Sequence, residues 1–297
     1  YYQKFMKVYF NLPGLFEKFH IVKQTILLYE NYPYIFRDNF IISSFYGSNG
    51  GVANGGRNSG HFNNEKEVEN FCKEHNLCPT IIMSNLFANE QYFPDDYASR
   101  IITTFDKKNT YFCLSNLYIE KWLENQGIRR GQFILSTTAC FDFEAIIKKT
   151  DQYKRIVLSE YMINDWKTIS LFPEHTRNKL EIIVNTICPN NCKSRKNHYE
   201  HISNLNINNN DITFKCIHES YCGNGNLYEI LNAPQVVTID MINTYLNLGI
   251  NHFKIQGRTN DDVDLIETFA YYLIKPKYQL MFREICHENS VNKNLIL

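Results

Sequence analysis

The sequence predicts an α/β fold, a TIM-like (β/α)8 barrel with a long cysteine-rich insertion before the last strand. Eight short apolar runs alternate with helical stretches along most of the chain. Strands that alternate with helices lie parallel, and eight such units close into a barrel. The runs are apolar on both faces, as a sheet enclosed by helices requires. A flat doubly wound sheet is the alternative, because periodicity alone does not show closure.

The individual elements follow from the spacing of apolar residues. Short runs bounded by polar or glycine-rich segments predict strands at 7–12, 40–46, 80–84, 111–115, 132–137, 155–159, 180–184 and 252–255. Apolar residues at three-and-four spacing predict helices at 15–29, 65–75, 97–105, 117–125, 143–149, 165–171 and 262–274.

The chain is predicted to form a single barrel domain over 1–287, followed by a flexible tail at 288–297. The one long connection, 188–251, carries an asparagine-rich run and four cysteines but no strong helical or strand pattern. Such an excursion is usually functional or disordered. A bound metal can order a loop that cannot bury a core of its own, so we interpret 188–251 as a metal-binding insertion.

Composition narrows the class of protein. Among 297 residues, 31 are Lys or Arg and 31 are Asp or Glu, so no overall positive charge draws the chain onto nucleic acid. The sequence contains no run of about 18 apolar residues, so it predicts no membrane-spanning helix. Nine cysteines without the spacing of a small disulfide scaffold indicate a reducing compartment. We therefore expect a cytoplasmic protein that does not contact membranes.

The cysteines of the insertion predict a metal centre. Cys188 and Cys192 are separated by three residues, and Cys216 follows in the same segment. The fourth ligand would be Cys222 or Cys140, which follows the predicted strand at 132–137. Zinc prefers shorter Cys-x-x-Cys spacing, whereas iron–sulfur clusters accept looser spacing. We expect an iron–sulfur cluster, with zinc as the alternative.

Lys254, Gln256 and Arg258 alternate at the end of the last predicted strand and therefore project from one face. On a barrel this face is the mouth, where two cations suit a carboxylate or phosphate. We assign Lys254 a catalytic role, and Gln256 and Arg258 a role in substrate binding. The alternative is a cluster of surface salt bridges.

Other predicted strands also end in polar residues, which a parallel barrel gathers at the same face. They are Ser48, Asn85, Asn116, Thr137, Glu160 and Asn185. Helix capping is the competing interpretation, and for Asn85 and Asn116 it is at least as good. From this set we take Glu160 as a catalytic candidate and Asn185 as a substrate-binding candidate.

The glycine-rich segment 47–57 is too dense in glycine for a plain turn and lacks the residues of a P-loop. Its backbone amides could form an anion-binding nest that includes Asn54 and Arg57, and a mobile lid is the alternative. His198 follows the cysteine pair as a general acid or base, or as a buttress of the cluster. The sequence contains neither a Gly-x-Ser-x-Gly motif nor a His-Glu-x-x-His motif.

Two motifs resemble peptidase family U-32, the collagenase-like proteases. One is Glu181-Ile-Ile-Val-Asn185 followed by Cys188, Cys192, Arg195 and His198-Tyr199, and the other is Phe253-Lys-Ile-Gln-Gly-Arg258. The family carries a glutamate where this chain has Gln256, so an acid role there is not carried over. Phe10-Asn-Leu-Pro-Gly-Leu-Phe16 and Asn54-Gly-Gly-Arg57 resemble a short bacterial subgroup of unsettled function.

The resemblance implies a barrel core and, as in several branches of the family, a 4Fe-4S cluster on four cysteines. The cysteine spacing of this chain departs from theirs, so the fourth ligand is not carried over, and we assign the ligands as Cys188, Cys192, Cys216 and Cys222. Members of those branches take part in oxygen-independent hydroxylation of ubiquinone precursors or RNA bases. We therefore expect an iron–sulfur enzyme that modifies RNA or a small anionic or aromatic substrate. Two alternatives stay open: a metal-dependent collagenase-like peptidase, and a non-catalytic subunit with a structural metal site and a protein partner.

Overall fold

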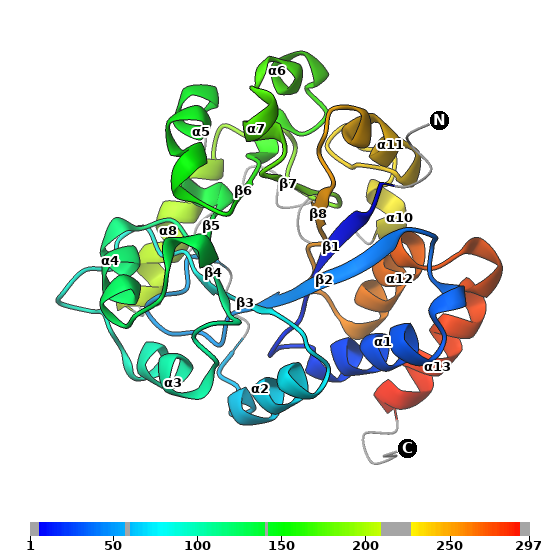
Figure 1. Ribbon diagram of the computed structural model, residues 1–297, viewed down its shortest axis with the longest axis horizontal. Helices are drawn as coiled ribbons and strands as arrows, with labels where there is room; N and C mark the ends of the chain where they lie inside the picture. The colour runs from blue at the N-terminus through cyan, green and yellow to red at the C-terminus, as the bar shows by residue number, and fades with distance from the viewer. Residues whose placement is uncertain (1–5, 57–59, 140–141, 209–226, 292–297) are drawn as a thin grey trace.

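The computed structural model describes residues 6–56, 60–139, 142–208 and 227–291. Its centre is a closed barrel of eight parallel strands that are neighbours in chain order, with β8 pairing back to β1 (Figure 1). The strands are β1 Val8–Pro13, β2 Phe40–Gly47, β3 Pro79–Met83, β4 Tyr111–Leu114, β5 Phe133–Leu135, β6 Arg155–Val157, β7 Leu180–Ile183 and β8 His252–Lys254. The predicted barrel and all eight predicted strands are confirmed.

Helices surround the barrel in chain order (Figure 1). They are α1 Phe19–Asn31, α2 Glu65–Glu74, α3 Asp96–Thr104, α4 Leu117–Asn125, α5 Phe143–Lys149, α6 Trp166–Leu171, α7 Glu174–Arg177, α8 Arg195–Asn208, α10 Leu227–Ile230, α11 Ile239–Asn247, α12 Asp262–Leu273 and α13 Gln279–Val291. Short 3₁₀ turns connect several of them, at Pro33–Ile35, Arg130–Gln132, Thr137–Ala139, Thr150–Gln152, Glu160–Met162 and Pro276–Tyr278. No described helix has the length and apolar character needed to cross a membrane.

Alternation along the strands sends apolar residues outward to the helices. Phe10 of β1 packs against Phe253 of β8 and Tyr272 of α12, with ring centroids 5.7 and 6.2 Å apart. The next residue, Asn11, points into the barrel, where its Nδ2 donates to Glu181 Oε1 of β7 at 3.0 Å. Strands β1 and β7 are not neighbours, so these side chains meet inside the barrel. The interior is therefore partly polar, where the sequence predicted apolar faces on both sides.

The largest correction concerns the long connection. The sequence indicated no strong elements between 188 and 251, yet the segment contains helices α8 and α11. α8 escaped detection because its residues, rich in Asn, His and Lys, show no apolar periodicity.

The bounds of two other helices also differ from the prediction. Helix α1 begins at Phe19 rather than residue 15, because the N–H groups of Gly14 and Leu15 donate to Tyr46 O. Helix α13 continues to Val291, so the segment predicted as a tail begins inside a helix.

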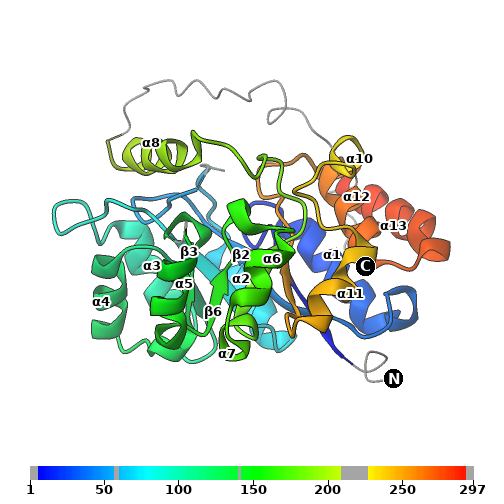
Figure 2. The ribbon, with the colours of Figure 1, turned by 90° about the horizontal axis from the view of Figure 1, so that it is seen from above.

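Helix α8 lies over the carboxyl ends of the strands (Figure 2). Polar contacts fix it to the loops that follow β2 and β3. Asn85 Nδ2 donates to Ser203 O at 2.9 Å, Ser203 Oγ accepts from Leu86 N at 3.2 Å, and Asn206 Nδ2 donates to Asn54 O at 2.6 Å. The helix therefore covers the face of the barrel at which active sites form.

Candidate active site at the barrel mouth

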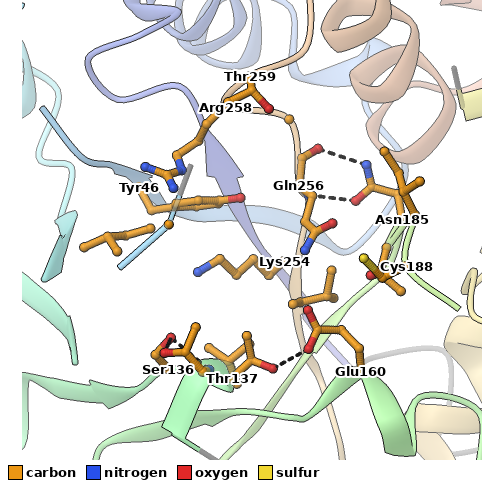
Figure 3. Close-up of a pocket in the computed structure, with 18 of the residues that line it drawn as sticks. Tyr46, Ser136, Thr137, Glu160, Asn185, Cys188, Lys254, Gln256, Arg258 and Thr259 are labelled. Carbon is orange, nitrogen blue, oxygen red and sulfur yellow. Dashed lines mark hydrogen bonds between the residues drawn. The ribbon is translucent and has the colours of Figure 1, made fainter. Parts of the chain in front are cut away.

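A cavity of about 190 Å³ lies at the carboxyl ends of the strands (Figure 3), and residues of α8 form part of its wall. Successive strands or the residues just after them contribute to its wall: Ser84, Cys113, Ser136, Glu160, Asn185 and Lys254. Tyr46 of β2 and Arg195, His198, Tyr199 and Ile202 of α8 complete it. The barrel topology thus collects at one place residues that are more than 200 positions apart in sequence.

Seven of the predicted site residues line this cavity: Glu160, Asn185, Cys188, His198, Lys254, Gln256 and Arg258. Asn54 and Cys192 are described but lie outside its lining. Arg57, Cys216, Cys222 and Cys140 fall outside the described residues. The barrel therefore brings together most of the polar residues selected from the strand ends.

Lys254 is only 7% exposed, and its ammonium group points into the cavity (Figure 3). Its Nζ lies 3.9 Å from the centroid of the Tyr46 ring. No described residue forms a hydrogen bond or ion pair with this ammonium. A cation–π contact contributes up to about 2 kcal/mol, whereas desolvating an ammonium costs several kcal/mol. The cavity therefore holds a cation that has no counterion among the described residues.

Arg258, the second predicted cation, is neutralised. Its Nη1 lies 3.2 Å from Glu17 Oε1, and both side chains are largely buried. Glu17 also accepts from Ser48 N at 3.2 Å. The guanidinium packs against Gly56, where a Cβ would lie 2.5 Å from Arg258 Nη2. Glu17 was not predicted, because it lies in the turn before α1 and carries no motif.

Glu160 is buried, and each of its carboxylate oxygens accepts a hydroxyl hydrogen bond. Thr137 Oγ1 donates to Oε2 at 2.6 Å, and Tyr199 OH donates to Oε1 at 2.9 Å. Burial, followed by the negative charge of Glu160, raises the pKa of Tyr199 well above its usual value. Tyr199 therefore keeps its proton and holds Glu160 from the α8 side.

Asn185 braces the ends of β7 and β8. Its Nδ2 donates to Gln256 O at 2.9 Å and its Oδ1 accepts from Gln256 N at 2.7 Å (Figure 3). These two bonds consume both ends of the Asn185 amide. The side chain of Gln256 stays available in the cavity wall.

The described part of the cysteine segment forms a turn. Cys192 N donates to Pro189 O at 3.1 Å, and Arg195 Nη2 donates to the carbonyl oxygens of Cys188 and Pro189 at 3.1 and 2.8 Å. The Arg195 guanidinium carbon lies 4.7 Å from the centroid of the Tyr161 ring, and Tyr161 OH donates to Cys192 O at 2.9 Å. Arg195 and Tyr161 thus fix the backbone that carries both thiols.

This turn carries two of the four cysteines predicted as metal ligands. It presents Cys188 to the cavity, and the adjacent Arg195 guanidinium can offset the negative charge of thiolates. The described residues alone contain no group of three or more Cys, His, Asp or Glu placed to hold a metal. Cys216, Cys222 and Cys140, the other proposed ligands, lie outside those residues.

His198 lines the cavity from α8, one turn after the cysteine segment. Asn54 instead shapes the loop after β2: its Nδ2 donates to Gly56 O at 3.0 Å, and its Oδ1 accepts from Gly56 N at 3.1 Å. Helix capping is confirmed for Asn116, which caps α4 by accepting from Tyr118 N at 2.8 Å. Asn85 caps no described helix: its Oδ1 accepts from Phe87 N at 2.8 Å within the loop after β3.

Sequence reasoning missed several cavity residues, among them Cys113, Tyr46 and Ser136. Cys113 is buried, and burial raises the pKa of its thiol, although the nearby Lys254 charge acts in the opposite direction. Cys113 and Tyr46 lie on predicted strands, so they could have been found by assigning each strand residue to the inner or the outer face of the barrel.

Comparisons with known proteins bear on the fold. The structure is similar to that of the U32 peptidase Mk0906, with a TM-score of 0.50 and 15% sequence identity, over 85% of this chain and 93% of that chain. No family model and no curated protein matches the sequence. At this identity the likeness shows the fold alone. The predicted resemblance to U32 peptidases is confirmed at that level.

Proposed function

We propose that the chain is an iron–sulfur barrel enzyme that carries out redox modification, such as oxygen-independent hydroxylation, of a small anionic or aromatic substrate in the barrel-mouth cavity. One observation carries the proposal: Cys188, Glu160 and Lys254 line the same cavity. A cluster held by Cys188, Cys192, Cys216 and Cys222 would then border the substrate. When bound, such a cluster supplies one-electron redox chemistry.

The residues of the chain itself would bind and shield the substrate. Lys254 offers an anionic group a positive charge that no described residue pairs with, and the Tyr46 ring forms an apolar wall beside it. Glu160 presents carboxylate oxygens that can accept a further hydrogen bond or a substrate proton. Helix α8 covers the mouth and limits access of bulk water.

The size of the cavity favours a small molecule over RNA. A cavity of roughly 150 Å³ is sufficient for a benzene ring, and this one encloses about 190 Å³. The same argument weighs against a collagenase-like peptidase, which must accommodate an extended polypeptide. That second candidate keeps one observation in its favour, the fold shared with a protein described as a U32 peptidase.

Metal content tests the proposal. We expect protein purified under anaerobic conditions to contain about four iron and four sulfide per chain. Cys188→Ser and Cys192→Ser should each lower iron content and visible absorption. Cys78→Ser is the control, because Cys78 precedes β3 and therefore lies at the opposite end of the barrel.

Zinc without sulfide, together with cleavage of gelatin-derived peptides, would support the peptidase instead. A protein with iron and sulfide that is inactive alone but copurifies with a partner would support a non-catalytic subunit. Unchanged iron content in both cysteine variants would overturn the proposed site.

A further inference from the structure

We infer that the cavity binds a ring-sized monocarboxylate, rather than a phosphate or a neutral ligand, through the ammonium group of Lys254. This inference rests on the proposed function for the location of the site, and it adds the chemical class of the substrate. It does not depend on which metal, if any, the cysteine segment holds.

The first argument is the state of the cations around the cavity. Arg258 is committed to Glu17 at 3.2 Å. Arg195 lines the cavity but uses Nη2 for two backbone carbonyls, and its Nε and Nη1 have almost no accessible surface and no hydrogen-bond partner among the described residues. Lys254 is the cation in the described wall whose charged end is both uncommitted and directed into the cavity (Figure 3).

The nearest layer of the interior does not supply the missing counterion. Glu181, two residues before the β7 partner of Lys254, is already held by Asn11 Nδ2 at 3.0 Å and by Arg155 Nη1 at 3.6 Å. Glu160, on the cavity wall, forms no ion pair with Lys254. An anion brought by the ligand would therefore complete the charge balance of the site.

The second argument separates carboxylate from phosphate. Phosphate sites gather several donors, commonly arginines, helix N-termini or nests of backbone N–H groups. Here one ammonium and the Gln256 side-chain amide are available, and the hydroxyl groups of Thr137 and Thr138 are already engaged. Thr137 donates to Glu160, and Thr138 Oγ1 donates to Ser136 Oγ at 3.0 Å. One positive charge matches one carboxylate.

The third argument is shape. Tyr46 packs its ring over the Lys254 ammonium, and its hydroxyl is fixed by donation to Ile255 O at 2.7 Å. Ile82, Val157 and Ile183 contribute apolar surface to the same cavity. A flat ring would contact these apolar groups while its carboxylate reaches Lys254, within a volume of about 190 Å³.

Isothermal titration with three phenyl probes tests the inference: benzoate, its neutral isostere benzamide, and phenyl phosphate. We expect benzoate to bind at least about tenfold more tightly than benzamide, as a charge-assisted hydrogen bond would produce, and more tightly than phenyl phosphate. Lys254→Met should remove the advantage of benzoate while leaving benzamide binding unchanged, which also shows that the cavity is intact. Lys254→Arg should keep part of that advantage.

Lys154→Met is the matched control, because Lys154 Nζ also lies over a tyrosine ring, 4.9 Å from the Tyr111 centroid, but at the amino end of the barrel. This variant should bind benzoate like the wild type. Equal affinity for benzoate and benzamide, tighter binding of phenyl phosphate, no binding of any probe, or unchanged benzoate affinity in Lys254→Met would each overturn the inference.

Iron measured in the same preparation separates the two proposals. Benzoate binding by protein without iron would support this inference and contradict the cluster. Iron-containing protein that fails to distinguish benzoate from benzamide would support the cluster and contradict this inference.

Discussion

Two buried cations inside the same barrel have opposite surroundings. Arg155 of β6 lies 3.6 Å from the buried carboxylate of Glu181, which Asn11 also holds. Lys254 of β8, nearer the carboxyl ends, is paired with no acid among the described residues and contacts the Tyr46 ring. Arg155 thus has a carboxylate partner inside the barrel, whereas Lys254 has none among the described residues, as the inferred carboxylate ligand would require.

The largest expected effect comes from breaking the pair of Arg155 and Glu181. Glu181→Ala would leave Arg155 as a buried, unpaired charge, which typically costs about 3–5 kcal/mol. We expect the free energy of unfolding, measured by urea denaturation, to fall by about that amount. A loss below about 1 kcal/mol would contradict the structural role given to this pair.

A smaller change in the free energy of unfolding is expected on lowering the pH, because of His252, which lies beside Arg155. Its ring stacks on Tyr9, with ring centroids 4.9 Å apart, and its Nδ1 lies 3.4 Å from Arg155 Nη1. Burial and, after it, the positive charges of Arg155 and Lys154 lower the pKa of His252 from 6.5 to about 4. The negative charge of Glu181 acts in the opposite direction. The native state therefore favours the neutral ring.

The sign follows from proton binding. Between pH 6.5 and about 4 the unfolded chain protonates His252 before the folded chain does, so stability rises with pH in this window and is fully present above it. The contribution lost at low pH is at most about 3 kcal/mol. Denaturation at a series of pH values should show a steeper loss in the wild type than in His252→Gln. Parallel profiles would contradict the assignment.

The smallest effect is expected at Lys254. Lys254→Met removes an ammonium that lacks a counterion and replaces it with an apolar chain of similar length. We expect the free energy of unfolding to change by less than about 1 kcal/mol or to increase. A loss as large as that of Glu181→Ala would mean that Lys254 is structural, and the contrast between the two cations would fail.

The fold was predictable because each strand is a short apolar run between turn residues, and eight such runs restrict the topology. The helices that were missed show where this signal ends. Helix α8 is held by side chains such as Ser203 and Asn206 that bond to loop backbone. Such contacts leave no apolar period in the sequence, so α8 could be found only in three dimensions.

The site was predictable in part for a related reason. Strand ends of a parallel barrel share one face, so Glu160, Asn185 and Lys254 could be selected from position alone. The position of a residue at a strand end did not predict which charged side chains form ion pairs. Arg258 and Lys254 look equivalent in sequence, but Glu17, more than 240 residues before Arg258, neutralises only the former. The partner of a buried charge is set by packing, which periodicity does not encode.

The most direct test of the central claim, that one cavity holds both the substrate and a cluster on Cys188, is an electron paramagnetic resonance spectrum. Anaerobically purified, dithionite-reduced protein should give a cluster signal that shifts when benzoate is added and does not shift with equimolar benzamide. A Lys254→Met sample should show no shift with either probe. A cluster signal that is unchanged while benzoate is bound would contradict the shared cavity.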